Sequence, residues 1–377
     1  MTRIGLAYNQ RPQPRASADV RDAAGPAATR PGDADADAAD DTDPSSTGPV
    51  ALAPEADDEF AEWDVPETID AVAGALAALG TVIRLEATGD FAERLRRARP
   101  DIVFNIAEGL HGVNREAHVP AICEFLDIPY TASDPFTCAL CLDKARTKEV
   151  LQAHGVRTAA WVLVRTAHDI AIAADVLTLP VFVKPVHEGS SKGITERNFC
   201  RTVAELHETC AFLLARYRQP VLAEAYLPGD EFTCAVIGNG DAARVLPIVR
   251  MKFDSLPAGA LPIYGFEAKW VWDGDGTTLD LYECPAQVAP ALARELERVT
   301  LAAYRATGCR DWGRVDLRLD AAGVPHVVEV NPLPGVLPNP ADNSCLPMAA
   351  RTAGLSYDGL IQRCLALAAE RQGVALA

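Results

Sequence analysis

Hydrophobic residues in the N-terminal part of the chain alternate between two spacings. Short apolar runs indicate buried strands, and stripes repeating every three or four residues indicate helices. Pro66 suits the first turn of one such helix, which ends at Gly80. This β-α alternation predicts a parallel sheet with flanking helices. The predicted strands are 3–8, 81–85, 101–105 and the start of a fourth at 129–131, and the predicted helices are 66–79, 91–99 and 118–126.

The pattern beyond residue 140 predicts a mixed sheet with fewer helices. Residues 314–319 and 326–331 both alternate polar and apolar positions, and Asp320 to Gly323 lie between them, which predicts a hairpin. The other predicted strands are 161–165, 180–184, 221–226 and 232–237, and the predicted helices are one that carries Lys144 and Lys148, 205–217 and 357–370.

The hairpin gathers charged residues on one face. With its turn centred near residues 322 and 323, Asp316 falls opposite Glu329 and Arg314 opposite Asn331. Directly opposed carboxylates repel each other, so a cation is expected between them. Oxygen ligands of this kind suit Mg²⁺, which bridges to nucleotide phosphates. A salt-bridged strand pair without a metal is the alternative.

Composition limits the class of protein. A chain of 377 residues that is 49% hydrophobic can form two or three domains, and its net charge of −17 argues against a nucleic-acid partner. Its apolar runs are shorter than the ~20 residues of a membrane span, and the N-terminus leads directly into a strand rather than a secretory signal. Ten scattered cysteines are typical of reduced thiols. We therefore expect a cytoplasmic protein without a membrane partner.

The acidic charge is concentrated near the N-terminus. Residues 10–62 contain ten Asp, three Glu and four Arg, and the stretch is rich in Ala, Pro and Gly with few large apolar side chains. Such a composition cannot offset the entropy lost on ordering. Residues 11–58 are predicted to be a disordered insertion in a surface loop, with docking of a partner as the alternative.

A second candidate site lies around Lys184, which ends an apolar strand. The strand leads into a glycine-flanked loop with Ser190 and Ser191, whose backbone N–H groups suit a polyphosphate. The strand 221–226 ends where an adenine slot is expected, and Glu231 is placed to hold ribose hydroxyls. Lys269 adds a further cation.

The order of these segments resembles the ATP-grasp superfamily and, within it, the D-alanine–D-alanine ligases. The resemblance runs from about residue 101 to residue 351. It is carried by the segments 103–105, 128–131, 142–144, 184–185 with 188–191, 224–231, 267–269, 314–316, 329–335 and 347–351.

The resemblance implies a role for each matching residue. Arg314 is expected to stabilise the tetrahedral intermediate, and Ser190 or Ser191 sits in the lid loop with Lys269 nearby. Ser344, beside a loop that contains Gly335, is expected to receive the acceptor's carboxylate. The implied ATP ligands are Lys144, Lys184, Glu224, Tyr226, Leu227 and Glu231, and the implied ligands of two Mg²⁺ ions, or of Mn²⁺, are Asp316, Glu329 and Asn331.

The sequence departs from the D-alanine ligases around the first substrate. Those ligases carry a Ser-x-Glu segment after the first strand that helps to hold the substrate's amine, whereas residues 9–12 read Asn-Gln-Arg-Pro here. Their His-Gly loop is replaced by residues 108–118, which makes Glu108, Arg115 and Glu116 candidates for the donor pocket. We therefore predict a donor other than D-alanine.

The predicted fold is an α/β ATP-grasp fold, in which an N-terminal parallel α/β domain precedes two α+β subdomains that sandwich ATP. The predicted boundaries are 1–140, 141–230 and 231–377. The predicted function is ligation of two amino acids or small peptides through an acyl phosphate, by a protein that is a homodimer in the resembled family. The alternatives are a ligase of a natural-product pathway, a phosphotransferase, and an ATP-binding regulatory protein that does not ligate.

Overall fold

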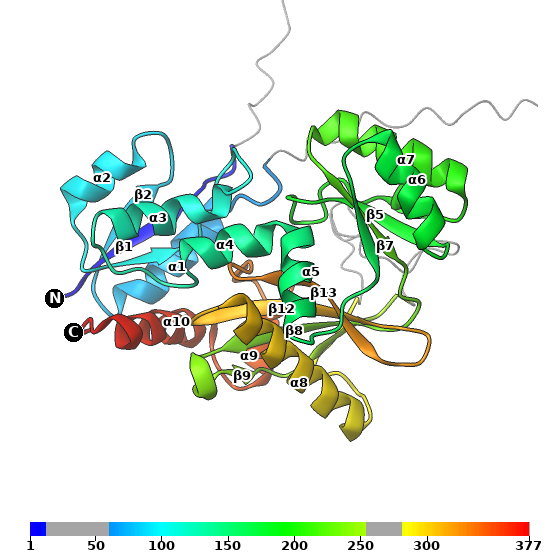
Figure 1. Ribbon diagram of the computed structural model, residues 1–377. Coiled ribbons are helices and arrows are strands. Elements are labelled where there is room, and N and C mark those ends of the chain that lie inside the picture. Colours follow the sequence, from blue (N-terminus) through cyan, green and yellow to red (C-terminus); the bar gives the residue numbers. More distant parts are fainter. Residues whose placement is uncertain (13–59, 254–280, 377) are drawn as a thin grey trace, which may run out of the picture.

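The computed structural model describes residues 1–12, 60–253 and 281–376. The insertion predicted over residues 11–58 lies almost entirely outside this part of the chain, and so does Lys269. The described residues form three sheets, each from its own stretch of sequence (Figure 1).

The N-terminal sheet is parallel, as predicted. Its order is β2 (Thr81–Glu86), β1 (Arg3–Tyr8) and β3 (Ile102–Asn105). The fourth strand predicted at 129–131 is wrong, because only one bridge forms, between Val103 and Tyr130. Ala132 has a φ of 68°, which turns the chain out of the sheet. The helices of this part are α1 (Pro66–Ala77), α2 (Phe91–Ala98) and α3 (His118–Phe125), with a short 3₁₀ turn η1 (Arg115–Ala117) before α3.

The central sheet is antiparallel and has the order β4 (Trp161–Val164), β7 (Val221–Ala225), β5 (Val181–Pro185) and β6 (Phe199–Cys200). Helices α6 (Ala167–Val176) and α7 (Val203–Tyr217) lie side by side on it (Figure 1). Helix α7 begins earlier than the predicted residue 205, because Thr202 and Glu205 form a capping box.

The C-terminal sheet runs in the order β11 (Tyr282–Glu283), β10 (Val249–Met251), β8 (Glu231–Ile237), β12 (Trp312–Leu319) and β13 (Pro325–Asn331), with β9 (Arg244–Val245) paired to β8. Helix α8 (Pro290–Thr307) packs against β12 and β13. The remaining helices are α4 (Pro135–Leu142), α5 (Lys144–Ala153), α9 (Cys345–Thr352) and α10 (Tyr357–Gln372).

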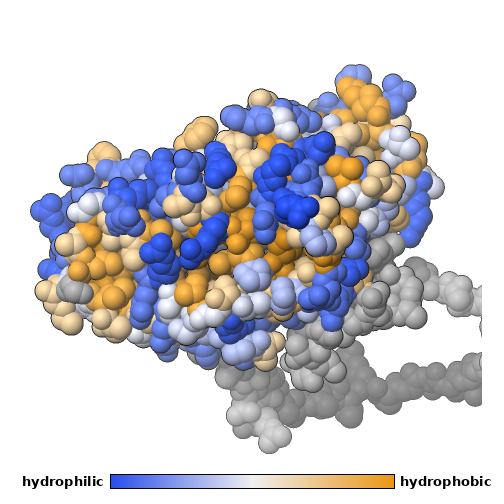
Figure 2. All heavy atoms as spheres, turned by 90° about the horizontal axis from the view of Figure 1, so that it is seen from below, coloured by the Kyte–Doolittle hydropathy of each residue, from blue (hydrophilic) through white to orange (hydrophobic). Residues whose placement is uncertain are grey.

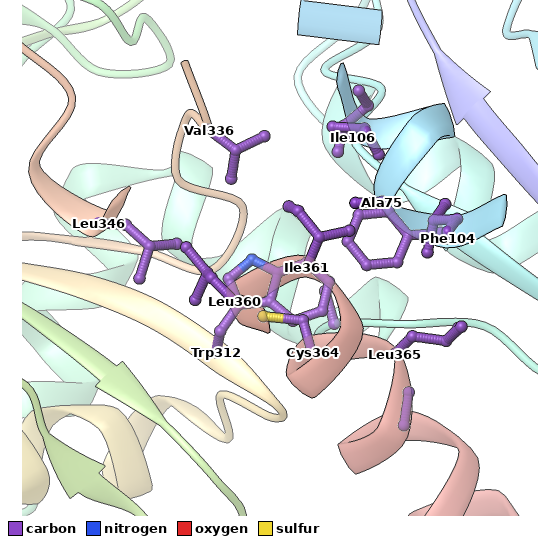
Figure 3. Close-up of a cluster of buried hydrophobic side chains, with 14 of the residues drawn as sticks. Ala75, Phe104, Ile106, Trp312, Val336, Leu346, Leu360, Ile361, Cys364 and Leu365 are labelled. Carbon is purple, nitrogen blue, oxygen red and sulfur yellow. The ribbon is translucent and has the colours of Figure 1, made fainter. Parts of the chain in front are cut away.

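A shared hydrophobic core joins the first and last sheets (Figure 3). Phe104 of β3 stacks on Trp312 of β12 with 5.4 Å between ring centroids and 15° between the ring planes. Leu360 and Ile361 of α10 complete the packing, and all four side chains are almost fully buried. Truncating either ring would cost about 3–5 kcal/mol. Because Trp312 precedes Arg314 on the same strand, this core also fixes the position of the charged hairpin.

The two ends of the chain lie side by side (Figure 1), and Thr2 Oγ1 donates to the backbone oxygen of Ala375 at 3.4 Å.

The face of the molecule that is seen from below carries hydrophobic residues with hydrophilic residues between them (Figure 2). Two exposed aromatic side chains, Phe125 of α3 and Phe136 of α4, are exceptions to the general burial of large apolar residues. Among the described residues, no helix has both the length and the hydropathy needed to cross a membrane.

Candidate active site

A cavity of about 470 Å³ lies where the three parts of the fold meet. Strands β5 and β7 form one wall, β8, β12 and β13 form the second, and residues 61–65 with Arg11 form the third. Most of the predicted site residues line this cavity: Lys144, Lys184, Ser190, Ser191, Glu224, Tyr226, Leu227, Glu231, Arg314, Asp316, Glu329, Gly335, Ser344 and Glu108.

The central-sheet wall holds a carboxylate between two lysines. Lys184 Nζ lies 2.7 Å from Glu224 Oε1, and Lys148 Nζ of α5 lies 2.8 Å from Glu224 Oε2. Burial alone would raise the pKa of Glu224, but the two ammonium groups lower it to about 2. Lys148 was missed as a site residue, although it stands one helical turn after Lys144 on the same face of α5.

Lys144 also lines the cavity, next to the loop that carries Ser190 and Ser191, which we call the serine loop. Lys144 Nζ donates to the backbone oxygen of Glu188 at 2.5 Å and lies 3.7 Å from Glu329 Oε2. Ser190 and Ser191 have φ values of 48° and 61°, a left-handed conformation that non-glycine residues rarely adopt. Such strain is typical of backbone shaped for a ligand, and successive backbone N–H groups in turns of this kind form anion sites.

The hairpin has the predicted register at its charged positions, and a one-residue shift follows between Asp316 and Leu317. Asp316 faces Glu329 and Arg314 faces Asn331 across β12 and β13. Arg314 Nη2 lies 2.8 Å from Asp316 Oδ2 and 3.5 Å from Glu329 Oε1, so its guanidinium bridges the two carboxylates. Asn331 Nδ2 lies 3.2 Å from Glu329 Oε1. The prediction that all four residues share one polar face is confirmed.

The chemistry of this face fits a magnesium site. Burial and the charge of Glu329 raise the pKa of Asp316 to about 6, although Arg314 opposes the change. Burial also acts to raise the pKa of Glu329, but Lys144, Arg314 and Lys184 lower it to about 2. The described residues contain no cluster of three His, Cys, Asp or Glu side chains placed for a metal. The donor set is instead two carboxylates and one amide, all with oxygen donors, which suits Mg²⁺ rather than zinc.

The far end of the cavity is organised by Arg318, which the sequence analysis did not single out. Its guanidinium contacts three of the predicted ATP ligands, Glu231, Tyr226 and Leu227. A signal was present in the sequence, because Arg318 continues the two-residue period of Arg314 and Asp316 along the same strand.

A third missed residue is Glu62, whose carboxylate lies near the first strand, where the sequence analysis expected none. Asp64 pairs with Gln10 in a parallel bridge, so the chain returns from the insertion to the place where it left. Glu62 therefore lines the cavity beside the end of β1. Residues 9–12 lack the Ser-x-Glu segment, but Glu62 brings a carboxylate close to the same strand, because the insertion separates the two segments in sequence but not in space.

Glu62 is held by two cations. Arg115 Nη2 lies 2.9 Å and 3.0 Å from its two carboxylate oxygens, and Lys192 Nζ lies 2.8 Å from Oε2. A Cβ atom on Gly189 would lie 2.3 Å from Glu62 Oε1, so a larger residue at that position would displace the Glu62 carboxylate. Burial acts to raise the pKa of Glu62, but Arg115 and Lys192 lower it overall.

Three further acids at this end of the cavity have raised pKa values despite the cations beside them. Burial raises the pKa of Asp64 to about 7 despite Arg11, and burial raises the pKa of Glu116 to about 7 despite Arg115. Burial and the charge of Glu116 raise the pKa of Glu108 well above its ordinary value. Of the three predicted donor residues, Glu108 lines the cavity, whereas Arg115 and Glu116 are buried behind it.

Ser344 lies at the opposite end, directly before α9. Its hydroxyl donates to the backbone oxygen of Gly335 at 3.1 Å and accepts from the backbone N–H of Leu337 at 3.3 Å. These bonds fix the hydroxyl beside the loop that follows β13, where both Ser344 and Gly335 line the cavity.

Comparisons with known proteins agree on one family. The family model described as the C-terminus of D-ala D-ala ligase matches residues 150–366. The D-alanine–D-alanine ligase of Bordetella petrii is 36% identical over 298 residues, covering 78% of this chain and 84% of that protein. An uncharacterised protein of Sinorhizobium fredii, y4sG, is 36% identical over 270 residues, covering 72% and 75%. The crystal structure of the D-alanine–D-alanine ligase from Bacillus anthracis complexed with ATP has a TM-score of 0.65 at 19% identity, covering 99% of each chain.

Proposed function

Since the chain belongs to the D-alanine–D-alanine ligase family of ATP-grasp proteins, it is an ATP-dependent ligase that joins a carboxylate to an amine, and we propose how this cavity performs the reaction. Lys144, Lys184 and the backbone of Ser190 and Ser191 bind the phosphates of ATP. The adenine lies against Tyr226 and Leu227, and Glu231 accepts from the ribose hydroxyls.

The chemical steps follow from these placements. An oxygen of the donor carboxylate attacks the γ-phosphorus, the bond to ADP breaks, and an acyl phosphate forms. The acceptor amine then attacks the acyl carbon, and phosphate leaves. Arg314 stabilises the negative charge of the tetrahedral intermediate, which is electrostatic preorganisation. Asp316, Glu329 and Asn331 would hold the two Mg²⁺ ions, or Mn²⁺, that neutralise charge on the phosphate oxygens.

The two amino-acid substrates enter from opposite ends. Glu62 accepts from the ammonium group of the donor, since a carboxylate held by Arg115 and Lys192 still has acceptor positions to offer. When the acceptor binds, the single hydroxyl proton of Ser344 turns from the oxygen of Gly335 to the carboxylate of the acceptor. We propose that Glu108 and the buried pair of Arg115 and Glu116 select the donor side chain. The expectation of a donor other than D-alanine stays a prediction, because Glu62 restores a place for its amine.

One observation carries the proposal. Lysines from two elements, a strained serine loop and a pair of opposed carboxylates all line the same cavity. The test is an amino-acid matrix screened for phosphate release with Mg·ATP, with the products identified by mass spectrometry. Phosphate release that requires two amino acids and yields a dipeptide supports ligation. Phosphate release without an amide product would indicate a phosphotransferase, and ATP binding without turnover would indicate a regulatory protein.

We further propose a homodimer in a reducing compartment such as the cytoplasm. Phe125 of α3 is 84% exposed and Phe136 of α4 is 73% exposed, and the two helices contact each other. Exposed aromatic groups of this size are typical of subunit interfaces. Light scattering should show a dimer that Phe125→Ser with Phe136→Ser converts to a monomer. All ten cysteines are free thiols, which supports the reducing compartment.

A further inference from the structure

The nucleotide end of the cavity depends on one buried arginine. Arg318 of β12 is 7% exposed, and its guanidinium reaches the segment that links β7 to β8. Nε donates to the backbone oxygen of Leu227 at 2.6 Å, Nη1 to Glu231 Oε2 at 2.9 Å, and Nη2 to the hydroxyl of Tyr226 at 2.8 Å. A planar guanidinium donates in several fixed directions, so one side chain sets the relative positions of all three groups.

The linking segment is also fastened by backbone contacts next to Arg318. Gly229 N–H donates to the oxygen of Leu319 at 2.9 Å, and Leu319 N–H donates to the oxygen of Asp230 at 2.9 Å. A Cβ atom on Gly229 would lie 2.7 Å from Leu319 Cβ, so glycine permits this close approach. The end of β12 therefore fixes both the backbone and the side chains of the segment.

The charge of Arg318 acts on Glu231, its cross-strand partner. Burial raises the pKa of Glu231, and Arg318 is the main group opposing that rise. A protonated carboxyl is a weaker acceptor for hydroxyl groups than a carboxylate. The guanidinium also lies 4.9 Å from the ring centroid of Tyr226, whose other neighbour is the Phe199 ring at 4.6 Å. Arg318 thereby orients the ring as well as the carboxylate.

We propose that Arg318 is a positioning residue for the nucleotide, which holds Tyr226 and Leu227 in place for the base and keeps Glu231 in place for the ribose. This role rests on the proposed ATP site. Arg318 acts through these three residues, so its loss should weaken nucleotide binding more than the chemical step.

The test measures nucleotide binding directly, by calorimetry with ADP and Mg²⁺ in the absence of amino acids. Arg318→Met should raise the Kd for ADP about 10- to 100-fold, because hydrogen bonds to charged groups are lost. Arg318→Lys should recover part of the affinity, since lysine keeps the positive charge but lacks the several fixed donor directions of the planar guanidinium. Arg298→Met is the matched control, because Arg298 is an exposed arginine of α8 that pairs only with Glu295 among the described residues.

Two further readouts separate positioning from a general structural defect. The KM for ATP should rise in Arg318→Met while kcat and the amino-acid KM values change little. The affinity of this variant should also fall more steeply than that of the wild type as the pH is lowered, because Glu231 protonates more readily without Arg318. The double variant Arg318→Met with Glu231→Gln leaves no unpaired buried charge, and its comparison with Glu231→Gln alone isolates the effect of Arg318 even if the single Arg318 variant unfolds.

The outcomes are distinct. An unchanged Kd in a folded Arg318→Met variant, or equal losses in kcat and in all KM values, would overturn the positioning role. An equal Kd for ADP in the double variant and in Glu231→Gln would overturn it as well. If the wild-type protein itself bound no nucleotide, the proposed function would fail and this role with it.

Discussion

The central-sheet wall and the N-terminal wall of the cavity both carry carboxylates shielded from solvent, but the pKa values of these carboxylates are shifted in opposite directions. Glu224 on the central sheet lies between Lys148 and Lys184, which lower its pKa to about 2. On the N-terminal wall, burial raises the pKa values of Asp64 and Glu116 to about 7. The cations of the central-sheet wall outweigh the effect of burial on Glu224, whereas Arg11 and Arg115 on the N-terminal wall do not outweigh it on Asp64 and Glu116.

The difference indicates what each wall binds. Glu224 keeps two lysines charged and in place, so Lys184 is ready for an anion such as a nucleotide phosphate. The N-terminal wall would gain most from a cation, and the ammonium group of an amino acid supplies one. Glu62 is the exception on that wall, since Arg115 and Lys192 already hold it ionised.

The largest loss of activity is expected from substitutions in the hairpin of β12 and β13. Asp316→Ala and Glu329→Ala should each lower kcat about 10²–10³-fold, because charge compensation for phosphoryl transfer is lost. Removing Asp316, whose pKa is raised, should leave the melting temperature without nucleotide unchanged or higher, whereas removing Glu329, whose pKa is lowered by Lys144, Arg314 and Lys184, should lower it. Thermal unfolding and a phosphate-release assay measure both quantities. Full activity in either variant would refute the metal assignment.

A stability effect should appear when the balanced wall is broken. Glu224→Gln leaves the ammonium groups of Lys148 and Lys184 buried without a counter-charge, which should cost about 3–5 kcal/mol in the free energy of unfolding. Urea denaturation measures this change. Glu295→Gln, which loses an exposed pair with Arg298, serves as the control and should change little. Similar losses of unfolding free energy in both variants would show that Glu224 does not compensate the buried charges of Lys148 and Lys184.

The sequence predicted the local parts of this site and missed the parts that depend on distant segments. The hairpin register followed from strand alternation and turn position alone, because Arg314, Asp316, Glu329 and Asn331 lie within one supersecondary unit. Glu62 could not be placed in the same way. It is more than fifty residues from the strand it accompanies, and only the bridge between Gln10 and Asp64 brings it there.

The fold shows the same division. The parallel N-terminal sheet followed from regular β-α alternation, whereas helices α4, α6 and α8 were not singled out. Helix α8 begins at Pro290, and its amphipathic stripe was not separated from the mixed sheet predicted around it. The contact between Phe104 and Trp312 joins two parts of the chain that no local pattern relates.

A smaller effect should test the donor end. Glu62→Gln keeps the shape of the side chain but removes the charge that faces the donor's ammonium group. We expect the KM for the donor to rise about 10- to 100-fold, while the KM for ATP stays close to that of the wild type. Steady-state kinetics with the best amino-acid pair from the matrix measures this split. An equal rise in both KM values would instead place Glu62 in the support of the serine loop, through its contact with Lys192.

The smallest effect concerns Asp64 and depends on pH. Its pKa in the folded protein is raised to about 7 by burial, above the ordinary value of an aspartate, so deprotonation favours the unfolded state. This cost is absent below about pH 4, where both states are protonated, and grows until about pH 7. Asp64→Asn removes it and should therefore stabilise the protein by about 1–3 kcal/mol near pH 8 and by nothing near pH 4.

Thermal unfolding of Asp64→Asn across this range checks the sign of the effect. Asp70→Asn is the control, because Asp70 lies exposed on α1 and pairs with the exposed Arg84. Donor added at high pH should narrow the difference between the wild type and Asp64→Asn, since a bound ammonium group compensates the carboxylate that the variant lacks. A constant stability difference at every pH would mean that the pKa of Asp64 is not raised in the folded protein, and the contrast between the two walls would then rest on Glu108 and Glu116 alone.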